Sequence, residues 1–509
     1  MKKRKKSAAK SGISGMLWHF SGSVVQILSQ FIVIGILSRL LTPEEFGVVG
    51  VIFVLVNFTS LFTNMGIATA IIQLKTISSK HLSLGYSMSL IIGILVGLLF
   101  YFIAPSVASF FNLNNADNAI RFFAIFFPLR SFNSVTSAIL ARDLRFSLIV
   151  KCGAMSYIFG IGLTSIVLAY LDFGYWALII GQFSGVLVTV GLMMYYSPPT
   201  FSFRFEKKIT SELLLFGSGH TLGHIFNYFG DNADKIIVGK SLGVVSMGIY
   251  TKAFQLFGIP TRFFGGIYDN VFFPILAKNQ DKKEKLSSFY LLSTSFCFGV
   301  LFPLATILFV NAELIVKIML GDQWGMVTFP FQILIFGMAY RFGTRINKSY
   351  LKSLGIIYKG AYYQFVFAVL MFTFCLIGGY FFELPGIASG VFIATFLNYL
   401  QMSYRLYNEL NFAKMYFLQL HLKTLILYVP FFIATMILYK LGIKDAWIHL
   451  CLSIFIYLPL FVVFITSKKN IVFNDVNAPM LTQIFNSLPP GAQNNFKKIS
   501  FLKNYFVKS

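Results

Sequence analysis

Long apolar stretches, each followed by a few polar residues, succeed one another along nearly the whole chain. A membrane-spanning helix needs about 20 mostly apolar residues, whereas a spanning strand would alternate apolar and polar residues over about ten. The continuous runs therefore predict helices rather than a barrel. We expect about fourteen transmembrane helices, at residues 16–38, 47–72, 83–104, 119–140, 152–171, 174–196, 212–238, 246–277, 288–310, 328–350, 361–381, 386–404, 422–440 and 446–466.

Composition leads to the same class of protein. The 509 residues are 57% hydrophobic and only 12% charged, and the mean hydropathy is +0.74. A soluble protein is about 25% charged. The sequence therefore predicts an all-α polytopic membrane protein.

The formal net charge of +24 follows the predicted topology. With the N-terminus inside, one side of the membrane collects most of the basic residues, from the run Lys2–Lys6 to the tail between Lys468 and Lys508. The other side holds few basic residues and most of the loop carboxylates. This asymmetry is the positive-inside rule, so we expect both termini in the cytoplasm and no nucleic acid partner.

A repeat with an offset of 201 residues divides the chain. The pattern His19-x-x-Gly22 … Arg39-Leu40-Leu41 … Gly47 recurs as His220-x-x-Gly223 … Lys240-Ser241-Leu242 … Gly248. It predicts two six-helix lobes in a parallel pseudo-repeat, and transporters commonly place the substrate site between such repeats. The expected parts are a basic cytoplasmic N-terminus (1–15), an N-lobe (16–196), a cytoplasmic linker (197–211), a C-lobe (212–404), an extra helix hairpin (405–466) and a basic cytoplasmic tail (467–509).

Several ionisable residues lie inside the predicted spans. Such groups are costly in hydrocarbon, so they usually face a bundle interior or a wet cavity and mark a transport path. Because most of them are cationic, we expect a cavity that accepts an anionic solute. The candidate cavity cations are Arg341, Arg345, Arg262, Lys235, Arg130 and Lys252, and the candidate carboxylates for coupling to H⁺ or Na⁺ are Asp231, Asp234 and Asp269.

Each candidate also has a purely structural interpretation. Asp231 and Lys235 are four residues apart on one span, so they can neutralise each other. Lys252 lies close enough to the outer surface to extend its ammonium group there. Pairing with carboxylates inside the bundle is open for Arg130, Arg341 and Arg345.

Loops and motifs argue against catalysis. External loops are short, the longest lying near 105–118 and 311–327, and the tryptophans at predicted outer ends, among them Trp324, are typical of interface anchors. The chain has no Walker A sequence, zinc-protease motif or Gly-rich nucleotide loop. Its four cysteines are isolated in separate spans. We therefore expect no catalytic residue, metal site or cofactor beyond a coupling ion.

Three groups of residues carry a resemblance to a known family. The first is Ser38-Arg39-Leu40-Leu41-Thr42-Pro43-Glu44-Glu45-Phe46-Gly47 with Asn64-Met65-Gly66-Ile67-Ala68. The second is Ala141-Arg142-Asp143-Leu144-Arg145-Phe146 with Phe173-Gly174-Tyr175-Trp176-Ala177-Leu178. The third is Asp234-Lys235-Ile236-Ile237-Val238-Gly239-Lys240-Ser241-Leu242-Gly243, with Gly248-Ile249-Tyr250 and Phe273-Pro274-Ile275-Leu276-Ala277. Together these blocks resemble the polysaccharide exporter (Wzx-type flippase) family.

The resemblance implies the multidrug/oligosaccharidyl-lipid/polysaccharide exporter fold, in which two six-helix lobes form a V around a central cavity. It also implies a bacterial cytoplasmic membrane flippase for undecaprenyl-diphosphate-linked oligosaccharide repeat units, serving O-antigen, capsule or exopolysaccharide synthesis by alternating access. An Arg-lined cavity would suit the diphosphate, because guanidinium groups donate paired hydrogen bonds to phosphate oxygens. The expected partners are the lipid-linked oligosaccharide, membrane lipids and, as candidates, a glycan polymerase and glycosyltransferases.

Two other functions stay open from the sequence. A cation-coupled multidrug exporter of the same superfamily would need an acidic and aromatic cavity, which the excess of arginine disfavours. A membrane glycan polymerase would be an enzyme and would need catalytic carboxylates on a sizeable loop, which the short external loops disfavour.

Overall fold

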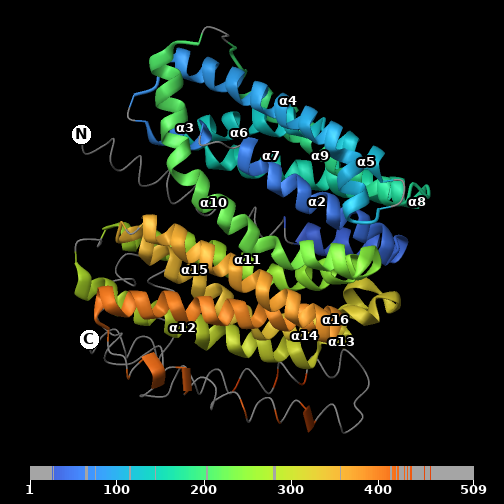
Figure 1. Ribbon diagram of the computed structural model, residues 1–509, viewed down its shortest axis with the longest axis vertical. Coiled ribbons are helices and arrows are strands. Elements are labelled where there is room, and N and C mark those ends of the chain that lie inside the picture. Colours follow the sequence, from blue (N-terminus) through green and yellow to red (C-terminus); the bar gives the residue numbers. More distant parts are fainter. Residues whose placement is uncertain are drawn as a thin grey trace. The chain divides into compact units, whose positions relative to one another are not determined.

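The computed structural model describes residues 28–412 with short gaps at 64–66, 75, 114–115, 144, 202–204, 279–281 and 356, together with residue 26 and scattered residues between 415 and 459. Every regular element in these ranges is a helix (Figure 1). The predicted N-terminal segment 1–15, nearly all of the spans 422–440 and 446–466, and the tail 467–509 lie outside the described residues.

The helices of the first half follow the apolar stretches. The first span is helical over Leu28–Leu40. After it come α2 (Pro43–Thr63), α3 (Ile67–Gln73), α4 (Ser79–Phe110), α5 (Asp117–Phe123), α6 (Phe126–Arg142), α7 (Phe146–Met155), the π-helix η1 (Ser156–Leu163), α8 (Thr164–Tyr170) and α9 (Tyr175–Tyr196). The elements α7, η1 and α8 follow one another without a break and together form one predicted span.

The second half contains α10 (Lys207–Ser241), α11 (Gly243–Lys278), α12 (Lys283–Val310), α13 (Ala312–Leu320), the 3₁₀ helix η2 (Asp322–Val327), α14 (Thr328–Phe336), α15 (Met338–Ser353) and α16 (Ile357–Leu410). Two predicted spans lie in α16, which breaks at Phe382 and Glu383, where the backbone leaves the helical conformation. The segment near 311–327, expected to be an external loop, is helical as α13 and η2, and its Leu320 and Trp324 are completely buried. Its place outside the membrane stays a prediction.

Six helical stretches among the described residues are long and apolar enough to cross a membrane. They are Ser79–Phe110, Asp117–Arg142, Phe146–Tyr170, Tyr175–Tyr196, Lys283–Val310 and Tyr362–Leu410. The all-α polytopic class is therefore confirmed, whereas the count of about fourteen spans stays a prediction.

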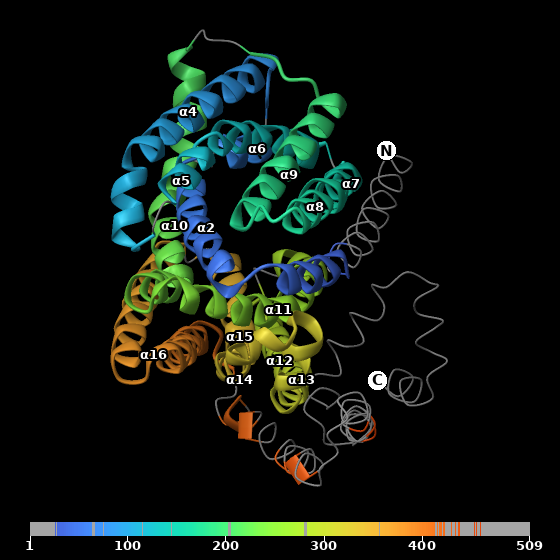
Figure 2. The same ribbon diagram turned by 90° about the vertical axis from the view of Figure 1, so that its right-hand side faces the viewer.

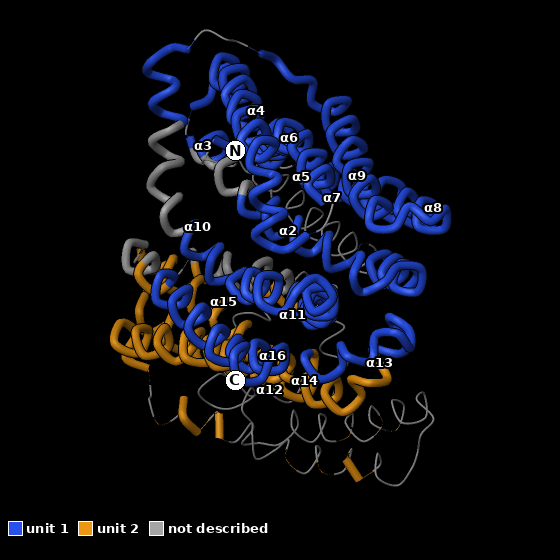
Figure 3. The backbone as a smooth tube through the Cα atoms, turned by 45° about the vertical axis from the view of Figure 1, so that its right-hand side comes forward, with its two compact units in different colours: residues 1–263, 316–330, 364–391 blue, residues 264–315, 331–363, 392–509 orange. Residues whose placement is uncertain are grey.

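The chain divides into two compact units (Figure 3). Unit 1 comprises Met1–Phe263, Val316–Pro330 and Gln364–Val391, and unit 2 comprises Phe264–Ile315, Phe331–Tyr363 and Phe392–Ser509. Within unit 1, α4 packs against α6, and α9 packs against η1 and α8 (Figures 1 and 2). Within unit 2, α12 packs against α15. The lobe boundaries expected around 197–211 stay a prediction.

The start of α2 explains part of the first family block. Pro43 occupies the first helical position, where its fixed φ suits a helix and its missing N–H is not needed. The Thr42 N–H donates to Glu45 Oε2 at 2.7 Å, and the Glu45 N–H donates to Thr42 Oγ1 at 3.3 Å. This reciprocal arrangement is a capping box, and it starts α2 directly after a short turn.

Arg142 explains part of the second block. Its Nη1 donates to the backbone oxygens of Ile71 and Leu74 at 2.6 and 2.7 Å. The last carbonyl groups of a helix have no partner within that helix. Arg142, the last residue of α6, therefore provides hydrogen-bond donors for the carbonyl groups at the end of α3.

Glycines of the predicted repeat meet each other in unit 1. A Cβ on Gly47 would lie 1.9 Å from the carbonyl oxygen of Val244, and a Cβ on Gly248 would lie 1.8 Å from that of Pro43. Pro43 and Val244 are 201 residues apart, as are Gly47 and Gly248. The contact is therefore reciprocal, as it would be across a two-fold axis. Only glycine allows the first turns of α2 and α11 to approach so closely.

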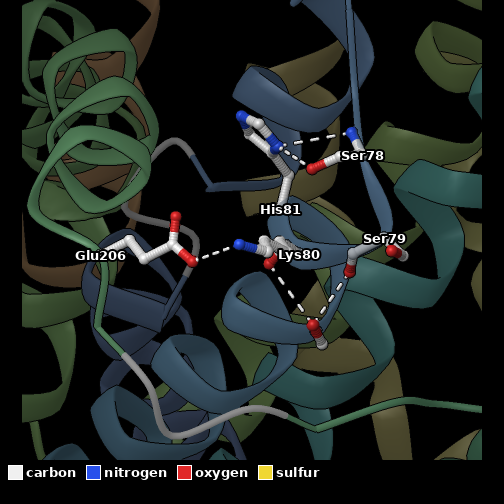
Figure 4. Close-up of polar contacts among 6 residues, drawn as sticks. Ser78, Ser79, Lys80, His81 and Glu206 are labelled. Atoms are coloured by element: carbon white, nitrogen blue, oxygen red, sulfur yellow. Dashed lines mark hydrogen bonds and ion pairs between the residues drawn. The ribbon is translucent and has the colours of Figure 1, made fainter.

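Polar contacts join the start of α4 to the residues that begin α10 (Figure 4). Lys80 Nζ lies 2.7 Å from Glu206 Oε1, and His81 Nε2 lies 3.2 Å from Glu212 Oε2. His81 also caps its own helix, because its Nδ1 accepts a hydrogen bond from the Ser78 N–H at 3.3 Å. The Lys80 and Glu206 side chains are 68% and 49% exposed, so water screens this pair and it contributes at most about 1 kcal/mol.

Replacing Gly47 or Gly248 with alanine is expected to lower the melting temperature of the detergent-purified protein. The added methyl group would collide with a backbone carbonyl, and overpacking of this kind costs about 1–3 kcal/mol. Gly191→Ala is the matched control, because nothing lies within 4 Å of its Cβ position. This control should be as stable as the wild type or more stable, since alanine favours a helix. Equal melting of the three variants would contradict the close backbone contact.

Candidate functional site

A cavity of about 350 Å³ lies within unit 1. The first span, α2, η1, α8, α9, α10 and α11 all contribute to its wall. Pockets for small molecules usually measure about 300–1,000 Å³, so it is large enough to enclose a polar head group but not a whole oligosaccharide. Three of the predicted cations, Lys235, Lys252 and Arg262, line it, and none of the described lining residues is acidic.

Corresponding residues of the two repeat copies line the cavity. Positions 201 residues apart both line it in three pairs, namely Ile34 and Lys235, Gly50 and Thr251, and Phe53 and Phe254. Its charge does not follow this symmetry. The three cations all belong to the second copy, and the corresponding positions in the first copy are Ile34, Val51 and Leu61.

Lys252 is the most enclosed of the three cations. The residue is 1% exposed, and its Nζ donates to Ser38 Oγ at 2.8 Å. Nζ also lies 3.4 Å from the centroid of the Phe46 ring and 5.3 Å from that of Trp324. The alternative in which Lys252 extends to the outer surface is therefore wrong. Lys252 forms no ion pair with a described residue, so an anion entering the cavity would compensate a charge that is costly to bury.

Lys235 is half-buried on α10. Its Nζ lies 4.2 Å from the centroid of the Phe254 ring and donates to Asn232 Oδ1 at 3.2 Å. It also lies 3.4 Å from the backbone oxygen of Asp231, while Asp231 Oδ2 accepts a hydrogen bond from Asn227 Nδ2 at 2.9 Å. These contacts hold the Lys235 ammonium group at the cavity wall.

Arg262 is exposed on α11, and Tyr157 of η1 lies within electrostatic range of it. Both residues line the cavity. An exposed guanidinium group can turn two of its N–H groups toward one anion, so Arg262 offers the paired hydrogen bonds that phosphate accepts.

The other predicted cations are not part of this cavity wall. Arg130 is exposed on α6 and is not among the lining residues. Arg341 and Arg345 lie on α15 in unit 2, where a Cβ on Gly265 would come within 2.2 Å of Arg345 Nη1. The guanidinium group of Arg345 therefore rests on the backbone of α11 at a glycine. The role of these three arginines in substrate binding stays a prediction.

Asp234 is a completely buried carboxylate on α10. Its Oδ2 accepts a hydrogen bond from the Tyr250 hydroxyl at 2.7 Å, and its Oδ1 has no hydrogen-bond partner among the described residues. An ionised carboxylate is costly to bury with an unused oxygen, so the geometry suits a group that takes up a proton or a cation. The side chain of Asp269 lies outside the described residues.

Sequence reasoning missed several polar residues of the wall. Gln30, Gln182 and Gln255 line the cavity together with Tyr157, and their amides add donors and acceptors beside the three cations. An amide inside an apolar span is the signal that would have found them. Over the described residues, no group of His, Cys, Asp and Glu side chains is arranged to hold a metal ion.

Comparison with known proteins identifies related sequences. The sequence model of the polysaccharide biosynthesis protein family matches residues 36–328, which is more than half of the chain. An uncharacterized membrane protein in the cps region of Klebsiella pneumoniae is 28% identical over 335 residues, 65% of this chain and 68% of that protein. Two further relatives are 26% identical. The teichuronic acid biosynthesis protein TuaB of Bacillus subtilis is matched over 62% of this chain and 66% of its own length, and the lipopolysaccharide biosynthesis protein WzxC of Escherichia coli over 63% and 66%.

Solved structures show the same fold. The lipid II flippase MurJ in an inward closed conformation superposes with a TM-score of 0.72 at 13% identity, covering 89% of this chain and 98% of that one. An inward-facing multidrug resistance MATE family transporter of the MOP superfamily gives a TM-score of 0.62 at 17% identity, covering 75% and 94%. The all-α polytopic fold of these exporters is therefore confirmed, whereas the arrangement as two six-helix lobes in a V stays a prediction. These two neighbours are named as a flippase and a transporter.

Proposed function

We propose, since this chain belongs to the polysaccharide biosynthesis protein family, that it is a flippase for undecaprenyl-diphosphate-linked oligosaccharides. It would move these repeat units across the bacterial cytoplasmic membrane for surface polysaccharide synthesis. The observation that carries the proposal is the cavity wall, which contains Lys235, Lys252 and Arg262 and no described carboxylate.

The cavity chemistry fits a diphosphate head group. A diphosphate ester carries about two negative charges, and moving it through hydrocarbon unpaired would cost many kcal/mol. Lys252 and Lys235 supply point charges, and Arg262 supplies paired hydrogen bonds to phosphate oxygens. The amides of Gln30, Gln182 and Gln255 can exchange hydrogen bonds with sugar hydroxyls. These polar groups in the cavity wall thus replace part of the water that the head group loses.

Transport would proceed by alternating access. The head group would enter from the cytoplasmic side while the polyprenyl tail stays in the lipid, and the cavity would then open to the outer side. Both termini would lie in the cytoplasm, as the distribution of basic residues indicates. A glycan polymerase and glycosyltransferases that make and use the same lipid-linked glycan are the proposed partners.

A multidrug exporter of the same fold is the second candidate function. Exporters of cationic drugs need negative charge in the cavity, because a buried cation must be paired. The described part of the cavity wall holds three cations and no carboxylate, so this alternative is disfavoured.

Arg262→Gln is expected to slow flipping about tenfold or more, because a charge-assisted hydrogen bond to phosphate is worth about 1.5–3 kcal/mol. The measurement follows a fluorescent undecaprenyl-diphosphate glycan in proteoliposomes and records the initial rate at which it crosses the bilayer. Arg262→Lys should retain part of the rate, since it keeps the charge but loses the paired geometry.

Arg145→Gln is the matched control for this experiment. It removes the same charge from an exposed position that does not line the cavity, so its rate should stay within about twofold of the wild type. Equal loss of rate in the Arg145 and Arg262 variants would show that net positive charge, and not the cavity, matters for transport.

We also propose that Asp234 couples transport to a proton or sodium gradient. Asp234→Asn would keep the hydrogen bond from Tyr250 but could not change its charge. Flipping by this variant should therefore no longer accelerate when a gradient is imposed across the proteoliposome membrane, while its rate without a gradient should be close to that of the wild type. An unchanged response to both ion gradients would exclude Asp234 as the coupling group.

A further inference from the structure

Ser38 joins the cavity to a segment far away in the sequence. It lies in the last turn of the first span and is completely buried. Its carbonyl oxygen accepts hydrogen bonds from Trp324 Nε1 at 2.7 Å and from Gln323 Nε2 at 2.5 Å. The last carbonyls of a helix lack partners within the helix, so η2 provides them here.

The Ser38 hydroxyl contacts a cation of the cavity, whereas the Ser38 carbonyl contacts η2. It accepts the hydrogen bond from Lys252 Nζ at 2.8 Å, and Lys252 lines the cavity. The rings of Phe46 and Trp324 lie on the same ammonium group and pack edge to face, with their centroids 5.5 Å apart. One hydroxyl and two aromatic rings therefore surround Lys252 on its protein side.

We propose that Ser38 and Trp324 are positioning residues for the anion site, an inference that rests on the proposed function. An ammonium group has three N–H donors and can rotate freely about its last bond. Ser38 takes one donor and Phe46 covers the charge from the side, so the remaining donors are held for an anion in the cavity. Trp324 acts one step further away, because its indole N–H holds the Ser38 backbone in place.

The surrounding contacts make this arrangement rigid. Arg39 donates from Nη1 to the Gly35 oxygen at 2.8 Å and from Nη2 to the Ile318 oxygen at 2.7 Å, so it ties the end of the first span to α13. Lys317 and Asp322 also form an ion pair of 2.8 Å between α13 and η2, but both side chains are largely exposed, so this pair adds little. A donor that is already held in its binding geometry loses less freedom when a ligand arrives, and this improves affinity.

The test measures the Kd of inorganic diphosphate for the full-length protein in detergent by calorimetry, together with the melting temperature of each variant. Ser38→Ala should raise the Kd about tenfold, which corresponds to the misplacement of one charged donor. Ser38→Thr, which keeps the hydroxyl, should bind nearly as the wild type does. Trp324→Phe keeps a ring but loses the N–H, and it should raise the Kd by about threefold.

Ser288→Ala is the matched control. It removes the same hydroxyl group from α12, where it donates to the Glu284 oxygen of its own helix at 3.2 Å and does not line the cavity. Its Kd should stay within about twofold of the wild type. Because Trp324→Phe tests the same idea from a second element, the proposal can still be judged if Ser38→Thr overpacks its buried site.

The outcomes separate the positioning role from the function itself. A lower melting temperature with unchanged diphosphate affinity in Ser38→Ala and Trp324→Phe would mean that both residues are only structural, and this would overturn the positioning role. If Lys252→Gln abolishes binding while those two variants bind normally, the proposed function survives and the positioning role fails. If the wild-type protein does not bind diphosphate, the anion site and everything that rests on it are overturned.

Discussion

The close approach of α2 and α11 is the contact on which the rest of the site depends. Gly47 and Gly248 let two helix starts meet backbone to backbone, where a single methyl group would collide with a carbonyl oxygen. This contact brings Phe46 from one helix over the ammonium group of Lys252 on the other. Because Gly47 and Gly248 have no side chains, the buried charge and the aromatic ring that stabilises it can lie together.

An internal repeat with unequal charge produces a polarised cavity. Paired positions of the two copies line it, but the second copy carries Lys235 where the first carries Ile34. A duplicated helix pair supplies two walls of similar shape, and substitution in one copy gives one wall its charge. The head group of an amphipathic substrate would therefore have a defined orientation, with phosphate oxygens toward α10 and α11 and uncharged groups toward the amides of Gln30 and Gln182.

The segment containing α13 and η2 shows where pattern reasoning failed. Its short length between two spans and its Trp324 are typical of an external loop with an interface anchor, yet Trp324 is completely buried and donates to Ser38. Amphipathic residues such as tryptophan are found both at membrane interfaces and in cores, and the two environments cannot be distinguished without the neighbouring helices.

The sequence by itself determined the helical membrane class and the positions of many spans, because these depend on local composition and spacing, and the resemblance of its motifs pointed to the family. Only the tertiary structure decided which cations line the same cavity. Lys235, Lys252 and Arg262 line one cavity, whereas Arg130, equally plausible from its position in a span, does not. Whether two side chains face one cavity depends on the packing angles and distances between helices, and these follow from contacts between residues as far apart in the chain as Ser38 and Trp324.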